Sequence, residues 1–373
     1  MRVGVSGAFG FLGANITVAA LAAGHQVVAG ASRTTAHPLI DPGRVKMVRL
    51  DIMDRDSVAR AFAGCDAIIH AAGAVDFRKK ARRRVWDINV LGSMNVYEAG
   101  LVLGVKKLVD LSSVNALGPS PNGAPLTEDS AEPYHAASPI MFRSADDALK
   151  AVDASASGDY SFIGRSRLAY YDSKLAALEL SRRYVRERGL PALTVYPGTA
   201  VGPGDVNHAI SRLVDGVWEG RLGLTYPGVS SFMDARDFAA GVIAALERGR
   251  VGQGYILAGG DRSVLSYAAF MDLVARVAAD TDGRSVRWGK TRVLPRWLAM
   301  AASGLAETLV PYLGLGAAMA LSGSLVNAFS SGKAARELGY APSTPLERSI
   351  ADCRAFSRAL RAGTPSTGAA GRA

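Results

Sequence analysis

The stretch MRVGVSGAFGFLG, residues 1–13, places three glycines at every third position directly behind a short apolar run. Residues 2–6 predict a short buried strand. Gly7 allows a tight turn, Gly10 lets the backbone approach a ligand closely, and Gly13 lets the following helix pack against its strand. The order of strand, glycine turn and helix at this point sets the interpretation of the remaining chain.

A helix is expected over residues 11–23, directly behind these glycines. Its N-terminal N–H groups and the positive end of its dipole suit an anion such as the pyrophosphate of a dinucleotide. The spacing is G-x-x-G-x-x-G rather than the G-x-G-x-x-G of other dinucleotide-binding enzymes, and glycines alone also fit a plain tight turn. Strand, glycines and helix in this order favour dinucleotide binding.

Length and composition are compatible with one large domain and a smaller one, because the chain has 373 residues, 49% of them hydrophobic. Cys65 and Cys353 are the only cysteines, too few for a disulfide framework or a cysteine zinc site, so a reducing compartment is expected. The five histidines show no metal-ligand spacing. The first strand begins at residue 2, which leaves no room for a signal peptide. These features predict a cytoplasmic protein without a metal site.

One segment is long enough to span a bilayer by count, because no charged residue lies between Glu307 and Lys333. Polar and helix-breaking residues interrupt it, at Pro311, Gly314, Gly316, Ser322, Gly323, Ser324 and Asn327. Two short helices over an apolar ligand pocket account for this composition better than a span does. Membrane contact is therefore not favoured.

Apolar strands alternate with helices through the first half of the chain. Strands are expected over residues 3–6, 26–31, 45–50, 67–71, 107–111 and 192–196, and helices over 11–23, 54–62, 85–103 and 165–188. This order predicts an α/β fold, a Rossmann-type doubly wound parallel sheet with helices on both faces. We expect a dinucleotide-binding domain over 1–200, a smaller, mostly helical substrate-binding part over 201–361, and a disordered tail over 362–373.

The second predicted strand ends without an acid, at Ala31-Ser32-Arg33. A carboxylate there would bind the ribose 2′-hydroxyl and repel a 2′-phosphate. Ser32 can donate a hydrogen bond and Arg33 can pair with a phosphate, which favours NADP(H) over NAD(H), unless Arg33 is only a solvated loop residue. After the third strand, Asp51 is placed to accept from the adenine amino group, although it could equally cap the helix that begins near Asp54.

Tyr170 and Lys174 lie four residues apart on a predicted helix, so both side chains share one face. A phenol has a pKa of about 10, and a neighbouring ammonium lowers it. Lys174 can supply this charge and hold the nicotinamide ribose, whereas Tyr171 has the wrong spacing. A chance surface pair is the alternative for Tyr-x-x-x-Lys.

Ser112 and Ser113 follow a predicted central strand, at the sheet edge where open α/β sheets place ligands. A serine hydroxyl at this edge can hydrogen-bond a substrate oxygen beside Tyr170. The alternative is a serine that merely ends the strand and starts a turn.

Taken together, these motifs make the chain similar to an extended short-chain dehydrogenase/reductase, with the order and spacing matched over about residues 1–360. Within that family the chain most resembles dihydroflavonol 4-reductase-like and 3β-hydroxysteroid dehydrogenase-like members. The matching segments are Gly7-Ala-Phe-Gly10-Phe-Leu-Gly13, Asp51-Ile52, His70-Ala71-Ala72-Gly73, Asn89-Val90-Leu91-Gly92, Ser112-Ser113, Tyr170-x-x-x-Lys174, Tyr196-Pro197-Gly198-Thr199, VGPGD, FMDARDFAAGVIAALERGRVGQGYILAGG and KAARELGYAPSTPLERSI.

The resemblance implies a catalytic set of Ser113, Tyr170 and Lys174, with Ser113 preferred to Ser112 by its distance from Gly118. Asn115 is a further polar group for the pocket. Cofactor contacts are implied for Gly7, Gly10, Phe11, Leu12, Gly13, Ser32, Arg33, Asp51, Ile52, Ala71, Ala72, Gly73, Lys174, Pro197 and Thr199. The Thr-Asp-Glu-type run of nucleotide-sugar dehydratases is replaced by Ser-Val-Asn, which removes the acid that drives dehydration.

Ser113 and Tyr170 are separated by 56 residues, more than the family usually has. The extra material lies around residues 132–165 and includes SADDALKAVDA, which predicts a short amphipathic helix starting near Ser144. Because this insertion falls between two catalytic positions, we expect it to cover the substrate site. A surface insertion unrelated to substrate is the alternative.

The net charge is +10, and FRKKARRR, residues 77–84, is the densest basic run. Three interpretations remain open: a solvated loop, a contact with an acidic partner such as a carrier protein or with an anionic substrate, and a nucleic-acid contact. No nucleic-acid motif accompanies the run, so nucleic acid is the least favoured.

The sequence thus predicts an NADP(H)-dependent oxidoreductase, a ketoreductase that interconverts a ketone or aldehyde and an alcohol on an apolar small molecule. Alternatives are a nucleotide-sugar epimerase or dehydratase, and a cofactor-binding regulator without turnover. The intact serine, tyrosine and lysine set counts against the regulator. A homodimer is an open prediction.

Overall fold

The computed structural model describes residues 1–33, 36–136, 138–208, 210–283, 290–309 and 316–363. Its centre is a seven-stranded parallel sheet in the order β10-β6-β5-β4-β1-β2-β3. The strands are β1 Arg2–Ser6, β2 Gln26–Ala31, β3 Val45–Arg49, β4 Ala67–His70, β5 Lys107–Leu111, β6 Ala192–Pro197 and β10 Gly254–Leu257. Strand order reverses between β1 and β4, and this is where such sheets bind dinucleotides. The predicted fold class is confirmed.

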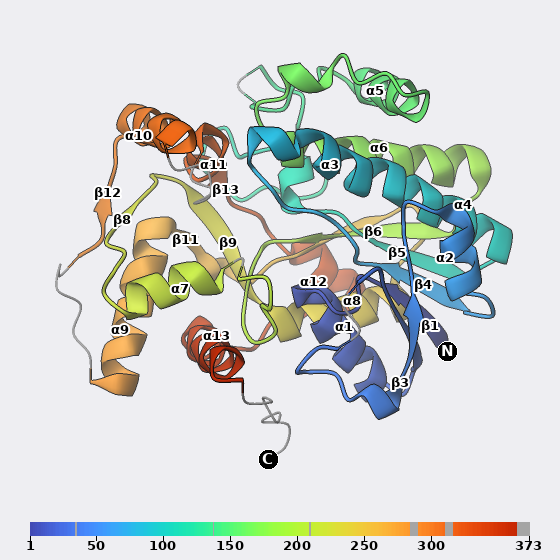
Figure 1. Ribbon diagram of the computed structural model, residues 1–373, viewed down its shortest axis with the longest axis horizontal. Helices are drawn as coiled ribbons and strands as arrows, with labels where there is room; N and C mark the ends of the chain where they lie inside the picture. Colours follow the sequence, from blue (N-terminus) through green and yellow to red (C-terminus); the bar gives the residue numbers. More distant parts are fainter. Residues whose placement is uncertain (34–35, 137, 209, 284–289, 310–315, 364–373) are drawn as a thin grey trace.

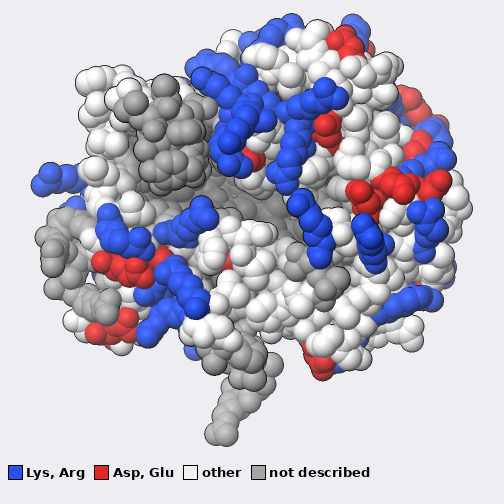
Figure 2. Space-filling model, viewed as in Figure 1, with Lys and Arg blue, Asp and Glu red and all other residues white. Residues whose placement is uncertain are grey.

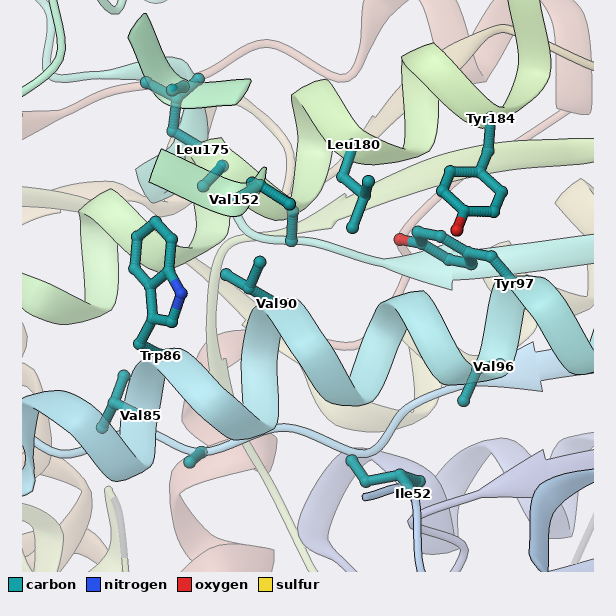
Figure 3. Packing of buried hydrophobic residues seen from close by; sticks show 14 of the residues in the cluster. Ile52, Val85, Trp86, Val90, Val96, Tyr97, Val152, Leu175, Leu180 and Tyr184 are labelled. Atoms are coloured by element: carbon teal, nitrogen blue, oxygen red, sulfur yellow. The ribbon is translucent and has the colours of Figure 1, made fainter. Parts of the chain in front are cut away.

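Helices cover both faces of this sheet, as Figure 1 shows. One layer holds α1 Phe11–Ala22, α8 Ala235–Arg248 and α12 Gly332–Leu338; the other holds α2 Arg55–Ala61, α4 Gly92–Leu103 and α6 Ala169–Arg188. In Figure 3, the Tyr97 ring of α4 lies against the Tyr184 ring of α6, and the buried Trp86 points toward Val152 and Leu175. This packing holds α6 firmly beside the carboxyl ends of the strands.

The helix expected over 85–103 is divided into three pieces. Helix α3, Arg82–Trp86, follows the short 3-10 turn η2, Lys79–Ala81, and runs into a π-helical turn, η3, Asp87–Leu91, before α4 begins. A π turn inside a helix frequently marks a functional position. The one here places Asn89 in a buried position facing α6.

After residue 200 the chain builds a smaller unit but also returns to the large sheet through α8 and β10. The smaller unit contains β7 Thr199–Val201, β8 Leu224–Thr225, β9 Val229–Asp234, β11 Val264–Ser266, β12 Arg292–Val293 and β13 Val326–Asn327. Its helices are α7 Ser211–Trp218, α9 Tyr267–Asp282, α10 Arg296–Leu309, α11 Ala317–Ser322 and α13 Leu346–Arg361. Strand β9 packs Phe232 flat on Phe270 of α9, with ring centroids 4.1 Å apart.

The insertion forms the predicted helix, α5 Ala145–Ala156, capped by the Ser144 hydroxyl, which accepts from the Asp147 N–H at 3.1 Å. Helix α5 packs on the outer side of α6, in a layer beyond it (Figure 1). The apolar residues Ala148, Ala151 and Val152 are buried there in the core cluster shared with α6. The apolar face of α5 therefore supports α6 from outside, and the cover over the substrate site by the insertion stays a prediction.

No helix in the described ranges combines the length and the apolar character needed to cross a bilayer. The uncharged segment forms α11 and β13, separated from α10 by residues 310–315, which lie outside the described ranges. Most of the predicted tail, from residue 364 on, lies outside them as well.

Candidate active site

The turn between β1 and α1 has no room for side chains. Gly7 has a φ of 69°, and a Cβ on it would lie 2.8 Å from the backbone nitrogen of Ala72. A Cβ on Gly13 would lie 2.0 Å from the Gly7 carbonyl oxygen. Gly10 is the N-cap of α1, so the first N–H groups of the helix begin here. The glycine cradle therefore fits the pyrophosphate of a dinucleotide.

Two further predicted cofactor segments lie at the ends of β2 and β3. Ser32 and Arg33 are exposed, and Arg33 forms no hydrogen bond or ion pair with the described residues. Asp51 is exposed, and its Oδ1 accepts from the Met53 N–H at 3.0 Å. The cap of α2 is Asp54, which accepts from two N–H groups of the helix, so Asp51 does not perform that role.

Ser113 and Tyr170 meet at the carboxyl end of β5. Ser113 is buried, and its Oγ also accepts from the Asn115 N–H at 3.2 Å, which starts the short turn η4, Val114–Leu117. Burial raises the pKa of the Tyr170 phenol, and the neighbouring Ser113 side chain acts in the opposite direction. The two hydroxyls therefore lie on the same side of the site, at the carboxyl end of β5.

Lys174 lies one helical turn beyond Tyr170, and its buried ammonium donates to the Leu111 carbonyl at 2.9 Å. A Cβ on Gly73 would lie 3.6 Å from its Nζ, so the loop after β4 passes directly beside the ammonium. Burial lowers the pKa of Lys174, and the Asp110 carboxyl opposes this shift. Tyr170 and Lys174 lie on one helix, α6, four residues apart, as the sequence predicts.

A buried polar network lies below Lys174. His70 at the end of β4 is hydrogen-bonded to Ser6 at 2.7 Å and to Ser93 at 3.0 Å. Burial and the nearby ammonium lower the pKa of His70 to about 3, so its ring is neutral at pH 7. Asp110 accepts from the Tyr97 hydroxyl at 2.9 Å, and burial raises the pKa of this carboxyl to about 6.

Asn89 received no role from the sequence reasoning, and Ser112 was only the less favoured of the two candidate serines. The Asn89 side chain makes two hydrogen bonds to the backbone of Ala74, at 2.8 and 2.9 Å, and donates to Ser173 on α6 at 3.0 Å. It therefore ties the loop after β4 to α6, and the Asn-Val-Leu-Gly motif was the sequence signal for it. The Ser112 hydroxyl is buried and finds no hydrogen-bond partner among the described residues.

The remaining predicted contacts lie on the β6 side. Pro197 ends β6, and Thr199 in β7 is hydrogen-bonded to Ser230 at 2.6 Å. The Tyr171 hydroxyl points to the smaller unit, where it is hydrogen-bonded to Ser322 at 3.0 Å and accepts from Asn327 at 3.2 Å. Tyr171 thus differs from the adjacent Tyr170, because its hydroxyl joins α6 to α11 and β13 by hydrogen bonds.

Both cysteines are free and buried. Within the described ranges, no three His, Cys, Asp or Glu side chains gather in an arrangement that could hold a metal ion. The polar groups at the site are hydroxyls, one ammonium and backbone groups, which suit proton transfer and dinucleotide binding.

The chain is similar to several enzymes along much of its length. It is 28% identical to sterol demethylase protein B of Methylococcus capsulatus over 68% of this chain and 69% of the relative. It is 23% identical to a putative dihydroflavonol 4-reductase of Synechocystis over 93% of this chain and 92% of the relative. A segment of 97 residues, 26% of each chain, is 36% identical to human 3 beta-hydroxysteroid dehydrogenase type 7.

A solved structure shares the fold. The dTDP-glucose 4,6-dehydratase DesIV of Streptomyces venezuelae, with NAD bound, superimposes with a TM-score of 0.71 at 21% identity, covering 98% of this chain and 99% of that one. The model of the NAD dependent epimerase/dehydratase family matches residues 3–143 and 144–258. The resemblance to extended short-chain dehydrogenases/reductases is therefore confirmed, and with it a nicotinamide dinucleotide as cofactor. The chain belongs to the NAD dependent epimerase/dehydratase family.

Proposed function

We propose that this protein is an NADP(H)-dependent oxidoreductase that interconverts a ketone or aldehyde and an alcohol on an apolar small molecule. The observation that supports this most directly is the placement of the buried Ser113 and Tyr170 side chains next to each other, with the ammonium of Lys174 one turn away along α6. A hydroxyl pair at the carboxyl end of a central strand is suited to hold one carbonyl oxygen and to give it a proton.

The bound nicotinamide supplies a hydride to the carbonyl carbon or accepts one from the alcohol carbon. In reduction, the Ser113 hydroxyl donates a hydrogen bond to the substrate oxygen, and Tyr170 transfers its phenolic proton to that oxygen. Lys174 stabilises the resulting phenolate by its charge and binds the nicotinamide ribose. Burial of all three side chains excludes water from the reacting atoms.

The preference for NADP(H) rests on the end of β2. Ser32 and Arg33 are exposed there, and the segment from Gly30 to Arg33 contains no acid. A free guanidinium pairs well with a 2′-phosphate, and no carboxylate repels it. Arg33→Ala should therefore weaken NADPH binding by about tenfold, the equivalent of one charge-assisted contact, and leave NADH binding unchanged. Equal affinity of the unaltered protein for both cofactors would contradict the preference.

The apolar substrate class is supported by the relatives' names, which include a sterol demethylase protein, a dihydroflavonol reductase and a hydroxysteroid dehydrogenase. The sugar-nucleotide enzymes share the fold, so epimerisation is the second candidate.

The decisive experiment incubates the purified protein with NADPH or NADH and a panel of apolar ketones and aldehydes. We expect net oxidation of NADPH with at least one hydrophobic carbonyl compound. Interconversion of a nucleotide sugar without net change of the cofactor would favour epimerisation, and cofactor binding without turnover on either panel would favour the regulator.

A further inference from the structure

The basic run of residues 77–84 begins with Phe77, whose side chain contacts Tyr170. The Phe77 ring lies edge-on to the Tyr170 ring, with centroids 5.9 Å apart and an interplanar angle of 72°. Lys80 follows three residues later, so its Cα is no more than about 10 Å of chain from that of Phe77. The cations of η2 and α3 therefore follow within a few residues of the aromatic contact with Tyr170.

Two arginines of the run hold it against the insertion. Arg82 donates to the Gly164 carbonyl at 3.3 Å, in the turn η5, Ile163–Arg165. The Arg83 guanidinium lies over the Tyr160 ring, 4.0 Å from its centroid. These contacts make the run part of an ordered wall rather than a solvated loop.

Acids near this wall already have partners. Residues 76–87 and 159–172 contain eight lysines and arginines but only four acids. Asp76 pairs with Arg78 at 2.6 Å. Asp87 accepts from the Tyr160 hydroxyl at 2.5 Å, and buried Asp172 accepts from Ser166 and from a backbone N–H.

Four exposed cations remain on these segments, and none of them forms a side-chain hydrogen bond or an ion pair with the described residues. They are Lys80, Arg84, Arg165 and Arg167, which we call the rim cluster. Lys80 and Arg84 are four residues apart along η2 and α3, a spacing that places side chains on one face. Arg165 is adjacent to the Gly164 carbonyl that Arg82 contacts.

Figure 2 shows Lys and Arg side chains gathered over the region that α3 occupies in Figure 1, beside the hollow in the middle of this face. Other Lys and Arg side chains lie at the left and right of this face, where Asp and Glu side chains accompany them.

We propose that the rim cluster binds a phosphate or pyrophosphate group carried by the substrate, while the apolar part of the same molecule reaches Ser113 and Tyr170. This inference rests on the proposed function and narrows its substrate class to phosphate-bearing carbonyl compounds. Several exposed Lys and Arg side chains on adjoining segments match a multiply charged anion. The contact of Phe77, at the start of the same run, with Tyr170 favours a group on the substrate itself over an extended nucleic acid.

The first test measures binding of inorganic pyrophosphate by calorimetry, with the protein saturated with NADPH so that the cofactor site is closed to the probe. We expect binding that weakens as salt is added. In Lys80→Glu/Arg84→Glu the affinity should fall by about tenfold or more, since each charge-assisted contact is worth that much. The matched control is Arg276→Glu/Arg358→Glu, the same charge change at exposed positions on α9 and α13, which should bind as the unaltered protein does.

A second variant, Lys80→Gln/Arg84→Gln, removes the two charges without reversing them. The affinity of each variant for NADPH is measured as well, and it should stay unchanged if the variants are folded. Pyrophosphate binding that is absent, or equal in all variants, would overturn the inference.

The second test compares KM for one carbonyl compound with and without a terminal phosphate. The phosphate-bearing form should have the lower KM, and only the rim variants should lose this advantage. Equal KM values would overturn the inference while leaving the proposed function intact. If the rim variants weakened pyrophosphate binding but no carbonyl compound were turned over, the phosphate site would be supported and the proposed function would be rejected. The rim variants could instead raise KM only for a substrate whose phosphate group is attached to an acidic carrier protein. That result would show that the rim cluster recognises the carrier surface, and it would overturn the inference.

Discussion

The turn between β1 and α1 and the first half of α6 form two sides of the same site, and they are built by opposite means. The turn excludes side chains, because a Cβ at Gly7 or Gly13 would lie within 2.8 Å or 2.0 Å of backbone atoms. Helix α6 instead buries Tyr170 and Lys174 among hydroxyl, carbonyl and carboxyl groups. The cradle is thus sensitive to added volume, whereas the catalytic side is sensitive to charge and to single hydrogen bonds.

The largest expected effect is on the catalytic side. Tyr170→Phe removes the group that transfers the proton, so turnover should fall by about 10²–10⁴-fold while NADPH affinity stays the same. Steady-state kinetics and a fluorescence titration of NADPH measure the two quantities. Tyr171→Phe is the matched control: it should keep its activity but lose about 1 kcal/mol of stability, because its hydrogen bonds to Ser322 and Asn327 are lost. Substantial turnover in Tyr170→Phe would remove this residue from the mechanism.

The neighbouring serines give the next contrast. Ser113→Ala should lower kcat by about 10²-fold, as loss of a positioned donor to the reacting oxygen does. Ser112→Ala should change kcat little, because the Ser112 hydroxyl has no hydrogen-bond partner among the described residues. If the two variants exchanged these effects, Ser112 would be the catalytic serine.

A third prediction concerns the network below Lys174. Burial raises the pKa of Asp110 from 3.8 to about 6, so between these values the folded protein binds a proton that the unfolded chain has released. The stabilisation from this proton is complete below about pH 4 and is lost as the pH rises through about 6, by roughly 3 kcal/mol. Asp110→Asn keeps an acceptor for Tyr97 without titrating. The difference in unfolding free energy between the unaltered protein and Asp110→Asn should change between about pH 4 and about pH 6. If the two proteins showed the same dependence of unfolding free energy on pH, the pKa of Asp110 would not be raised.

The smallest effect tests the cradle. Gly13→Ala adds one methyl group 2.0 Å from the Gly7 carbonyl oxygen, which should cost about 1–3 kcal/mol of stability and weaken both NADPH and NADH. Gly10→Ala is the milder comparison, since its Cβ would be 3.3 Å from the same oxygen. Calorimetric melting and cofactor titration measure the two losses. Equal effects at both glycines would argue against a steric cause.

Much of the fold could be predicted because its signals are local. The strands over 26–31 and 107–111 have the predicted bounds, and α5 begins next to Ser144, where a helix start was predicted. The π turn at Asp87–Leu91 could not be predicted from apolar periodicity, since Asn89 is held by partners on a loop and on another helix. Strand β10 was missed as well, because it joins the sheet through β6, about 60 residues earlier in the chain.

The sequence by itself determined the glycine turn, the alternation of strands and helices, and the common face of Tyr170 and Lys174. Each depends on residues a few positions apart, whose backbone conformation sets their relation. Only the tertiary structure decided that Ser113 meets Tyr170, that α5 supports α6 from outside, and that Phe77 brings a basic run to the same tyrosine. These relations join distant residues, and their distances follow from how helices and strands bury their apolar faces against one another.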